Sequence, residues 1–367
     1  MQDRVKEKYE YIPLILMMLF MAGAFIHQKL YALTAPWGTL TVFIGLCVIL
    51  FLYMRGNREE ILKTDPVSIA CIVAVIITPV NLFVLGSGKG AALIVFDLVL
   101  IFFLILRGFR ISGRIKRGTA LAGSVLMLLW YPVVRWDYGF NMVGLAFIIL
   151  LIFGEILLEY VKNDLGMEYL KYVQILFFVT SVLLAVCYQA RSAALSMAVF
   201  GLFYLLTPVI INKRAIYNVC IFAFTIGSIL FTLFYTLLGK TGWNGRLLYK
   251  DLLSGRELIW QELWQEFLKK PLTGIGSSYE MKNFFMFEVH NGLFDILTVH
   301  GILVFIPVLF LLIRTLSSLF SPDVKFCPDK RLAMTGIYTL LFASFFENGF
   351  ITTPYSVVFF ALLLICS

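Results

Sequence analysis

The chain has 367 residues, of which 60% are hydrophobic and only 14% charged, and its formal net charge is +8. A water-soluble domain carries roughly 25% charged residues, so this composition excludes a soluble protein and indicates an all-α polytopic membrane protein. The strands of a membrane β-barrel would appear as about 10-residue segments of alternating polarity, and these are absent from the sequence. The positive charge does not indicate a nucleic-acid partner, because the basic residues cluster in short loops between apolar runs.

Apolar runs of about 20 residues match the hydrocarbon thickness of a bilayer. They predict a single integral membrane domain, residues 1–367, whose first run is a retained span. About twelve transmembrane helices are expected, near residues 12–28, 38–54, 66–85, 91–106, 118–134, 140–158, 170–188, 193–211, 216–238, 301–319, 333–348 and 351–366. Counts of eleven to thirteen stay open, because the fourth run is short and the last two almost touch.

Basic residues orient the predicted spans in the cytoplasmic membrane. The N-terminus and every second loop hold most of them, and the short loops on the other side carry only Lys29, Lys89, Arg135 and Arg191. By the positive-inside rule both termini are cytoplasmic, and the large loop at residues 239–300 is extracytoplasmic. The six cysteines show no paired spacing, so neither a disulfide framework nor a zinc signature is expected.

Two charges in or beside the predicted spans are functional candidates by default. Asp97 lies inside the fourth run, where it either caps a local polar network or faces the bundle interior. Arg191 follows a tight hairpin between the seventh and eighth runs. Its guanidinium either snorkels to the surface or faces an external vestibule, where its planar fork suits phosphate oxygens.

The loop at residues 239–300 holds most of the candidate chemistry. Ser254 and Glu257 have the spacing of a capping box, which predicts a helix over residues 254–270 that ends before Pro271. One face of this helix is apolar and carries Trp260, Leu263, Trp264, Phe267 and Leu268. The helix therefore lies flat on the outer leaflet or packs on the outer mouth of the bundle.

Arg256 would lie in the first turn of that helix. A positive charge is unfavourable there, but with the free backbone N–H groups it makes a seat for a phosphate. The alternative is an ion pair with Glu257 or Asp251. Glu347, at the end of the eleventh run, is a carboxylate that could pair with Arg191 or Arg256.

His290 comes just before the tenth predicted span. A neutral imidazole accepts a hydroxyl proton near pH 7, as a general base requires. The alternative is a histidine with a structural role only.

Three segments of the large loop occur in an order typical of one family: Ser-Gly-Arg-Glu-Leu-Ile-Trp (254–260), Lys-Lys-Pro-Leu-Thr-Gly-Ile-Gly (269–276) and His-Asn-Gly-Leu-Phe-Asp-Ile-Leu-Thr-Val-His-Gly (290–301). With Gln-Ala-Arg-Ser-Ala-Ala at 189–194, they resemble the O-antigen ligase / O-antigen polymerase superfamily. The resemblance covers residues 180–301, and the rest of the chain by topology only. His300 departs from the family pattern, so no role is assigned to it.

The resemblance implies a GT-C-like membrane glycosyltransferase without a metal or other cofactor. Its substrate would be an undecaprenyl-diphosphate-linked glycan at the outer face of the cytoplasmic membrane. Carried onto this chain, Arg191 and Arg256 bind the donor diphosphate, and His290 activates the acceptor hydroxyl for inverting attack. We add Asn291, Asp295 and Glu347 as candidate supporting residues. Membrane lipid and a chain-length regulator are candidate partners.

The reaction that we expect is polymerisation of repeat units of a capsule, an exopolysaccharide or an O-antigen. The motifs do not separate it from a ligase, which transfers lipid-linked glycan to a surface acceptor. A lipid-linked oligosaccharide flippase or an ion-coupled transporter is the alternative of another class. A flippase needs cationic residues along a central cavity, and a transporter needs several intramembrane acids or broken helices. Asp97 is nearly alone among such acids, which favours the glycosyltransferase.

Overall fold

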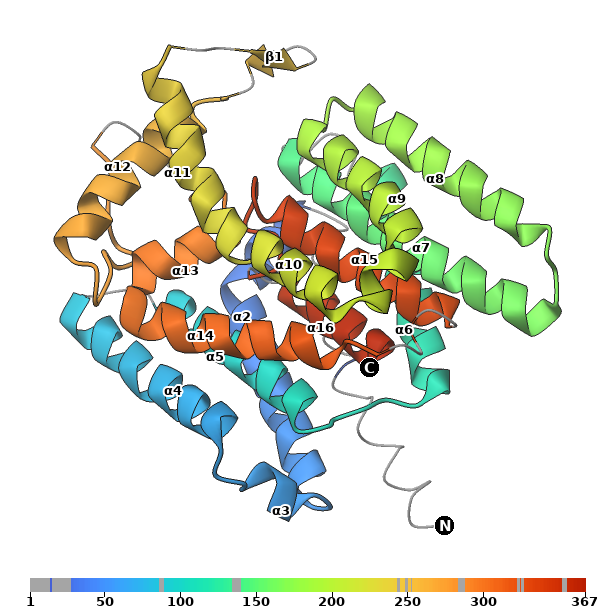
Figure 1. Cartoon of the computed structure of the whole chain (residues 1–367), viewed down its shortest axis with the longest axis horizontal. Coiled ribbons are helices and arrows are strands. Elements are labelled where there is room, and N and C mark those ends of the chain that lie inside the picture. Colours follow the sequence, from blue (N-terminus) through green and yellow to red (C-terminus); the bar gives the residue numbers. More distant parts are fainter. Residues whose placement is uncertain are drawn as a thin grey trace.

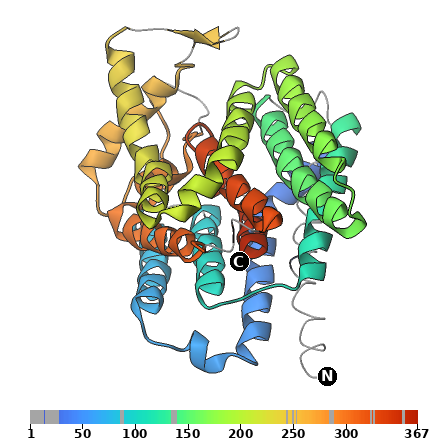
Figure 2. The same cartoon turned by 45° about the vertical axis from the view of Figure 1, so that its right-hand side comes forward.

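The computed structural model describes residues 14, 28–85, 89–133, 140–242, 245–247, 250–251, 253–282, 288–321, 324, 327–351 and 355–367. These residues form helices, their connections and one pair of two-residue antiparallel strands (Figures 1 and 2). The elements are α2 (Gln28–Met54), α3 (Arg58–Ile61), α4 (Pro66–Leu85), α5 (Lys89–Leu106), α6 (Gly113–Val133), α7 (Phe140–Leu165), α8 (Leu170–Cys187), α9 (Arg191–Asn212), α10 (Arg214–Phe224), α11 (Ile226–Lys240), β1 (Arg246–Leu247), β2 (Lys250–Asp251), α12 (Arg256–Lys269), α13 (Gly292–His300), α14 (Ile302–Ser318), α15 (Pro328–Ala343) and α16 (Tyr355–Cys366).

Several of these helices are long and apolar enough to cross a membrane, which supports the membrane class predicted from composition. By length and composition alone, four described segments qualify: Trp37–Met54, Pro66–Val84, Leu170–Cys187 and Arg191–Asn212. The bent pair α10 and α11 makes a fifth if it is one span. The predicted count of twelve is not confirmed. The first predicted span, at residues 12–28, lies outside the described residues except at its positions 14 and 28.

The predicted ninth span, residues 216–238, is broken in the middle. The axes of α10 and α11 differ by 46°, and Thr225 at the break has φ −104° and ψ −81°. Thr225 Oγ1 donates to the carbonyl of Ile221 at 2.7 Å, a side-chain bond that bends helices because it competes with the backbone ladder. Beyond the bend, Ser228 in the first turn of α11 is hydrogen-bonded to Asn291 at the start of α13.

The C-terminal helices form the centre of the bundle. Every residue of α16 is buried, and α16 is apolar on all sides, as expected for a helix surrounded by protein. Its 12 residues rise about 18 Å at 1.5 Å per residue, short of the roughly 30 Å hydrocarbon core. Figure 1 shows α15 and α16 in the middle of the molecule, and α11 leading from there toward the β1 hairpin, with α12 against it.

The stripe predicted on α12 faces protein. Trp260, Leu263 and Phe267 are buried, and the Trp260 ring lies edge-on to Tyr235 of α11 with centroids 5.1 Å apart. The alternative of a helix packed on the bundle is therefore the one observed. Leu268 is the member of the predicted stripe that remains exposed.

The predicted capping box at the start of α12 is wrong. The N-cap is Gly255, and no side chain caps the helix. Ser254 and Gly255 both have left-handed φ, 58° and 82°, so the serine does not occupy the N-cap position and Glu257 does not reach back to it. The Ser254 hydroxyl instead accepts a hydrogen bond from Arg191.

The Pro-Leu-Thr-Gly-Ile-Gly turn at residues 271–276 fastens the end of α12 to α13 and α14. Ile275 N–H donates to the carbonyl of Thr298 at 2.8 Å, and Ile302 N–H donates to that of Pro271 at 2.9 Å. Gly274 has φ +78°, and a Cβ there would lie 2.5 Å from the carbonyl oxygen of Val299. Only glycine combines this conformation with such a close backbone crossing, so the motif is structural.

Candidate active site

The His-Asn-Gly segment at residues 290–292 is fixed by hydrogen bonds from three elements. Asn291 is the N-cap of α13, and its Oδ1 accepts from the backbone N–H of Phe294 at 3.0 Å. Its Nδ2 donates to the carbonyls of Ser228 and Phe345, both at 3.3 Å. Asn291 is completely buried. This predicted supporting residue is therefore an anchor that joins α11, α13 and the end of α15.

Gly292 sets how closely α13 approaches the end of α15. Its N–H donates to the carbonyl of Ser344 at 3.1 Å, and a Cβ at position 292 would clash with Ser344 Oγ. A larger residue would push the two segments apart. The close approach places His290 beside Glu347, in the turn that follows α15.

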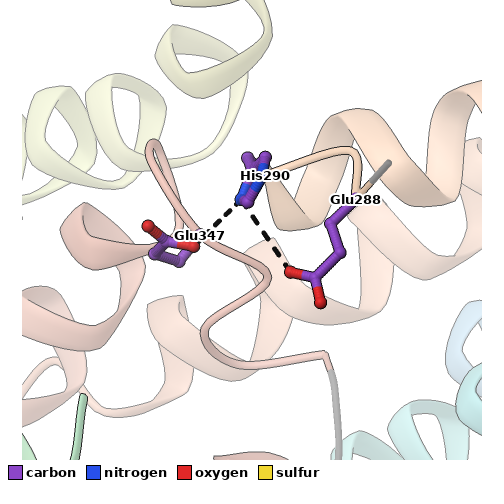
Figure 3. A group of neighbouring side chains, drawn as sticks. All are labelled: Glu288, His290 and Glu347. Atoms are coloured by element: carbon purple, nitrogen blue, oxygen red, sulfur yellow. Dashed lines mark hydrogen bonds and ion pairs between the residues drawn. The ribbon is translucent and has the colours of Figure 1, made fainter. Parts of the chain in front are cut away.

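Glu347 joins two of the predicted site residues. Its Oε2 lies 3.0 Å from His290 Nδ1 (Figure 3), and its Oε1 accepts a hydrogen bond at 2.7 Å from Arg256 Nη2. Glu347 is 3% exposed, so both interactions gain from low local polarity. The predicted pairing of Glu347 with Arg256 is confirmed. The alternative ion pair of Arg256 with Glu257 is not observed. The other alternative, an ion pair of Arg256 with Asp251, involves a side chain that lies outside the described residues.

The contact with Glu347 indicates which ring nitrogen of a neutral His290 carries the hydrogen. A carboxylate only accepts hydrogen bonds, so the neutral imidazole must carry its hydrogen on Nδ1 in this contact. The lone pair of Nε2 is then free to accept a proton. A carboxylate holds the catalytic imidazole of Ser-His-Asp hydrolases in the same way. The His290 side chain is 20% exposed, so the ring remains accessible to a substrate.

Arg191 approaches the same place from α9. It is the first residue of α9, as Arg256 is of α12, and backbone N–H groups at helix starts lack intrahelical partners. Arg191 Nη2 donates to Ser254 Oγ at 2.7 Å, two positions before Arg256. This bond places Arg191 beside the residues that lead into α12. Arg191 therefore contacts the 239–300 segment, and its position in an external vestibule stays a prediction.

Backbone strain is concentrated at this site. Among the described residues, three non-glycine residues have positive φ: Gln189 (57°), Ser254 (58°) and His290 (53°). Gln189 lies two positions before Arg191, and Ser254 is its hydrogen-bond partner. Such conformations cost of order 1–3 kcal/mol each and cluster where function requires a fixed geometry. Their location independently favours a functional site here.

Asp295, another predicted supporting residue, lies in the first turn of α13. Its Oδ2 accepts a hydrogen bond from Asn348 Nδ2 at 3.3 Å, which ties α13 to the turn that carries Glu347. Burial and, to a lesser degree, the charge of Glu288 raise the pKa of Asp295 to about 7. Asp295 therefore links α13 to the turn that carries Glu347.

Glu288 is a neighbour of the site that the sequence did not reveal. Its Oε2 lies 3.9 Å from His290 Nδ1, and its side chain is 72% exposed (Figure 3). Among the described residues, Glu288, His290 and Glu347 each offer one metal-ligand atom, and these atoms lie within 4.8 Å of one another. In the sequence, only the order Glu-Val-His at residues 288–290 could have indicated this group, and three residues are too few to identify a site.

Three acidic side chains are buried in helices away from this site. Asp97 in α5 is 1% exposed, and neither of its carboxylate oxygens has a hydrogen-bond partner among the described residues. It therefore faces the interior and caps no polar network. Glu155 and Glu159 in α7 are also buried, and Glu159 pairs with Lys162 at 2.7 Å. The prediction that Asp97 is nearly alone is wrong, because Glu155 is also buried and lies within the predicted span at residues 140–158.

Comparisons with protein-family models, with curated proteins and with solved structures find no match for this chain.

Proposed function

We propose that the chain is a membrane glycosyltransferase that polymerises undecaprenyl-diphosphate-linked repeat units at the outer face of the cytoplasmic membrane. The product would be a capsule, an exopolysaccharide or an O-antigen. The observation that carries the proposal is the connected set of Arg256, Glu347 and His290, with Arg191 bonded to Ser254 two positions before Arg256. It combines an oriented base with two fixed cations, as inverting transfer from a diphosphate donor requires.

In this reaction the oxygen of the acceptor hydroxyl attacks the anomeric carbon from the side opposite the diphosphate. His290 Nε2 accepts the hydroxyl proton as the new C–O bond forms. The bond between the anomeric carbon and the phosphate oxygen breaks, and its electron pair leaves with undecaprenyl diphosphate. Arg191 and Arg256 stabilise the charge of the leaving group, and Glu347 stabilises the imidazolium.

The proposal is tested with the purified full chain and a lipid-linked repeat unit as both donor and acceptor. The wild-type protein should give a ladder of longer lipid-linked glycans. His290→Ala should give no product while it elutes as a single folded species in detergent. Full activity of His290→Ala would remove the general-base assignment.

Ligation to a surface acceptor uses the same chemistry and the same site residues. Deleting the gene in its host separates the two activities. Loss of the ladder with single repeats remaining supports polymerisation, and full-length polymer retained on the lipid carrier supports ligation. An unchanged surface and lipid-linked profile would contradict both.

A transporter is the second candidate function, and the buried Asp97, Glu155 and Glu159 favour it. Intramembrane acids are typical of proton and ion pathways. Broken helices are another transporter feature, and α10–α11 is such a helix. Asp97→Asn and Glu155→Gln should leave in vitro glycan transfer intact if the chain is a glycosyltransferase. A transporter would give no transfer product with any variant and would move lipid-linked glycan across vesicles.

The proposed topology places both termini in the cytoplasm and residues 239–300 outside. It rests on the basic residues of the short loops, because the positive-inside rule is counted there. Cysteine labelling in intact cells tests it. A single cysteine at exposed position 280 should react with a membrane-impermeant maleimide, and protection of that cysteine would reverse the orientation.

A further inference from the structure

Three ligand atoms meet beside Nδ1 of His290. They are His290 Nδ1, Glu347 Oε2 and Glu288 Oε2, with separations of 3.0 Å and 3.9 Å from the nitrogen and all within 4.8 Å of one another (Figure 3). Tetrahedral ligands at zinc–ligand distances of about 2.0–2.1 Å lie roughly 3.3 Å apart. The separations of 3.0 Å and 3.9 Å lie on either side of this value. A shift of about 1 Å in the exposed Glu288 side chain would bring all three atoms to the spacing of zinc ligands.

The charges also suit a cation. Glu347 uses Oε1 for Arg256, which leaves Oε2 directed at His290. Glu288 is too far from His290 for a hydrogen bond, and its side chain is 72% exposed, so other surface rotamers are open to it. Two carboxylates and one guanidinium leave a net negative charge beside a neutral imidazole. A water molecule would supply the fourth ligand from the exposed side.

We propose that Glu288, His290 and Glu347 form an inhibitory site for a divalent transition metal, with Zn²⁺ as the best-fitting ion. One imidazole with two carboxylates suits zinc, whereas Mg²⁺ and Ca²⁺ prefer six or more oxygen ligands. Metal binding takes the lone pair of Nδ1, so the single proton of the neutral ring moves to Nε2. The ring then has no free lone pair for a hydroxyl proton. Metal binding stands on the geometry alone, whereas inhibition rests on the proposed function.

The binding test uses isothermal titration of ZnCl₂ into the full chain in detergent, followed by X-ray absorption at the zinc edge. The wild-type protein should bind one zinc ion with a histidine nitrogen and carboxylate oxygens as ligands. Glu288→Gln should weaken binding at least tenfold. The control Glu280→Gln, an exposed acid of the same segment, should bind as the wild type does. Equal affinity of the Glu288 variant, or a spectrum without histidine, would overturn the site.

The activity test adds ZnCl₂ to the glycan-transfer reaction. Zinc should inhibit the wild-type protein and a chelator should restore activity, whereas Glu288→Gln should keep its activity at the same zinc concentration. MgCl₂ at equal concentration should not inhibit. Zinc bound through these ligands without inhibition would refute the inhibitory role and the assignment of His290 as base. Absence of binding would refute the metal site and leave the proposed function untouched.

Discussion

Replacing Glu347 by glutamine tests the central contact of the site, because it changes the charge and almost nothing of the shape. In the wild-type protein, Glu347 Oε1 accepts from Arg256 and Oε2 lies 3.0 Å from His290 Nδ1. The glutamine oxygen can still accept from Arg256. Its NH₂ group would then face Nδ1 and donate to it, which forces the imidazole hydrogen onto Nε2.

The expected cost follows from this reversal. General-base catalysis contributes about 10²–10⁴ in rate, and a wrong tautomer in a comparable carboxylate–imidazole pair costs about 10⁴. We expect kcat of Glu347→Gln to fall by about 10²–10⁴. The KM for the lipid-linked donor should change little, because Arg256 keeps its hydrogen bond. Glu347→Ala should also lose stability, since it leaves a largely buried guanidinium unpaired.

Two measurements check this reasoning. Transfer assays at varied donor concentration give kcat and KM separately, with Glu280→Gln as the matched control. NMR of ¹⁵N-histidine protein reports the tautomer, and the chain has only three histidines to assign. A kcat within threefold of wild type, or a His290 tautomer unchanged by the substitution, would refute the proposed role of Glu347.

Three further predictions concern the surroundings of this contact. Arg191→Lys should raise the KM for the lipid-linked donor, because an ammonium lacks the planar fork of a guanidinium; an unchanged KM would exclude Arg191 from donor binding. Gly292→Ala should destabilise the protein by about 1–3 kcal/mol through its clash with Ser344, seen as a lower melting temperature, and Ser344→Gly should restore part of the loss. With a pKa raised to about 7, Asp295 contributes stability below its unfolded value of about 4 and loses it as pH rises to 7. The melting temperature of Asp295→Asn should therefore fall less than that of the wild type between pH 4 and pH 7, and parallel curves would contradict the raised pKa.

Composition and apolar run length predicted the membrane class and the approximate position of the helices, because both follow from the chemistry of a bilayer. They did not settle how many helices span. The run at 351–366 contains a helix of only 12 residues that is surrounded by protein, and buried and lipid-facing helices are equally apolar. The break lies at Thr225, whose backbone angles cannot be read from its residue type, because Thr207 and Thr335 make the same side-chain bond inside unbroken helices.

The apolar stripe of α12 shows a related ambiguity. Its spacing predicted one apolar face, which is observed for Trp260, Leu263 and Phe267. Spacing does not distinguish a protein surface from a lipid surface, since both favour the same side chains. The capping box failed for another reason. A left-handed Ser254 removes the hydroxyl from the N-cap position, and no feature of the sequence reports that conformation.

The sequence indicated which residues form the site, but it indicated only some of their hydrogen-bond partners. Residue chemistry and segment order pointed to Arg191, Arg256 and His290, and the pairing of Glu347 with Arg256 was one of two expected. The bond from Arg191 to Ser254 spans 63 positions, and tertiary packing alone determines it. Glu288 was missed because its exposed side chain gains meaning only beside His290.

The sharing of Glu347 between a base and a cation links the two halves of the proposed reaction. Arg256 donates one of its five N–H groups to Glu347. A diphosphate beside Arg256 draws the guanidinium charge away from Glu347, whose carboxylate then stabilises the imidazolium form of His290 more strongly. One carboxylate would thus hold the proton acceptor and a cation for the leaving group in a fixed relation to each other.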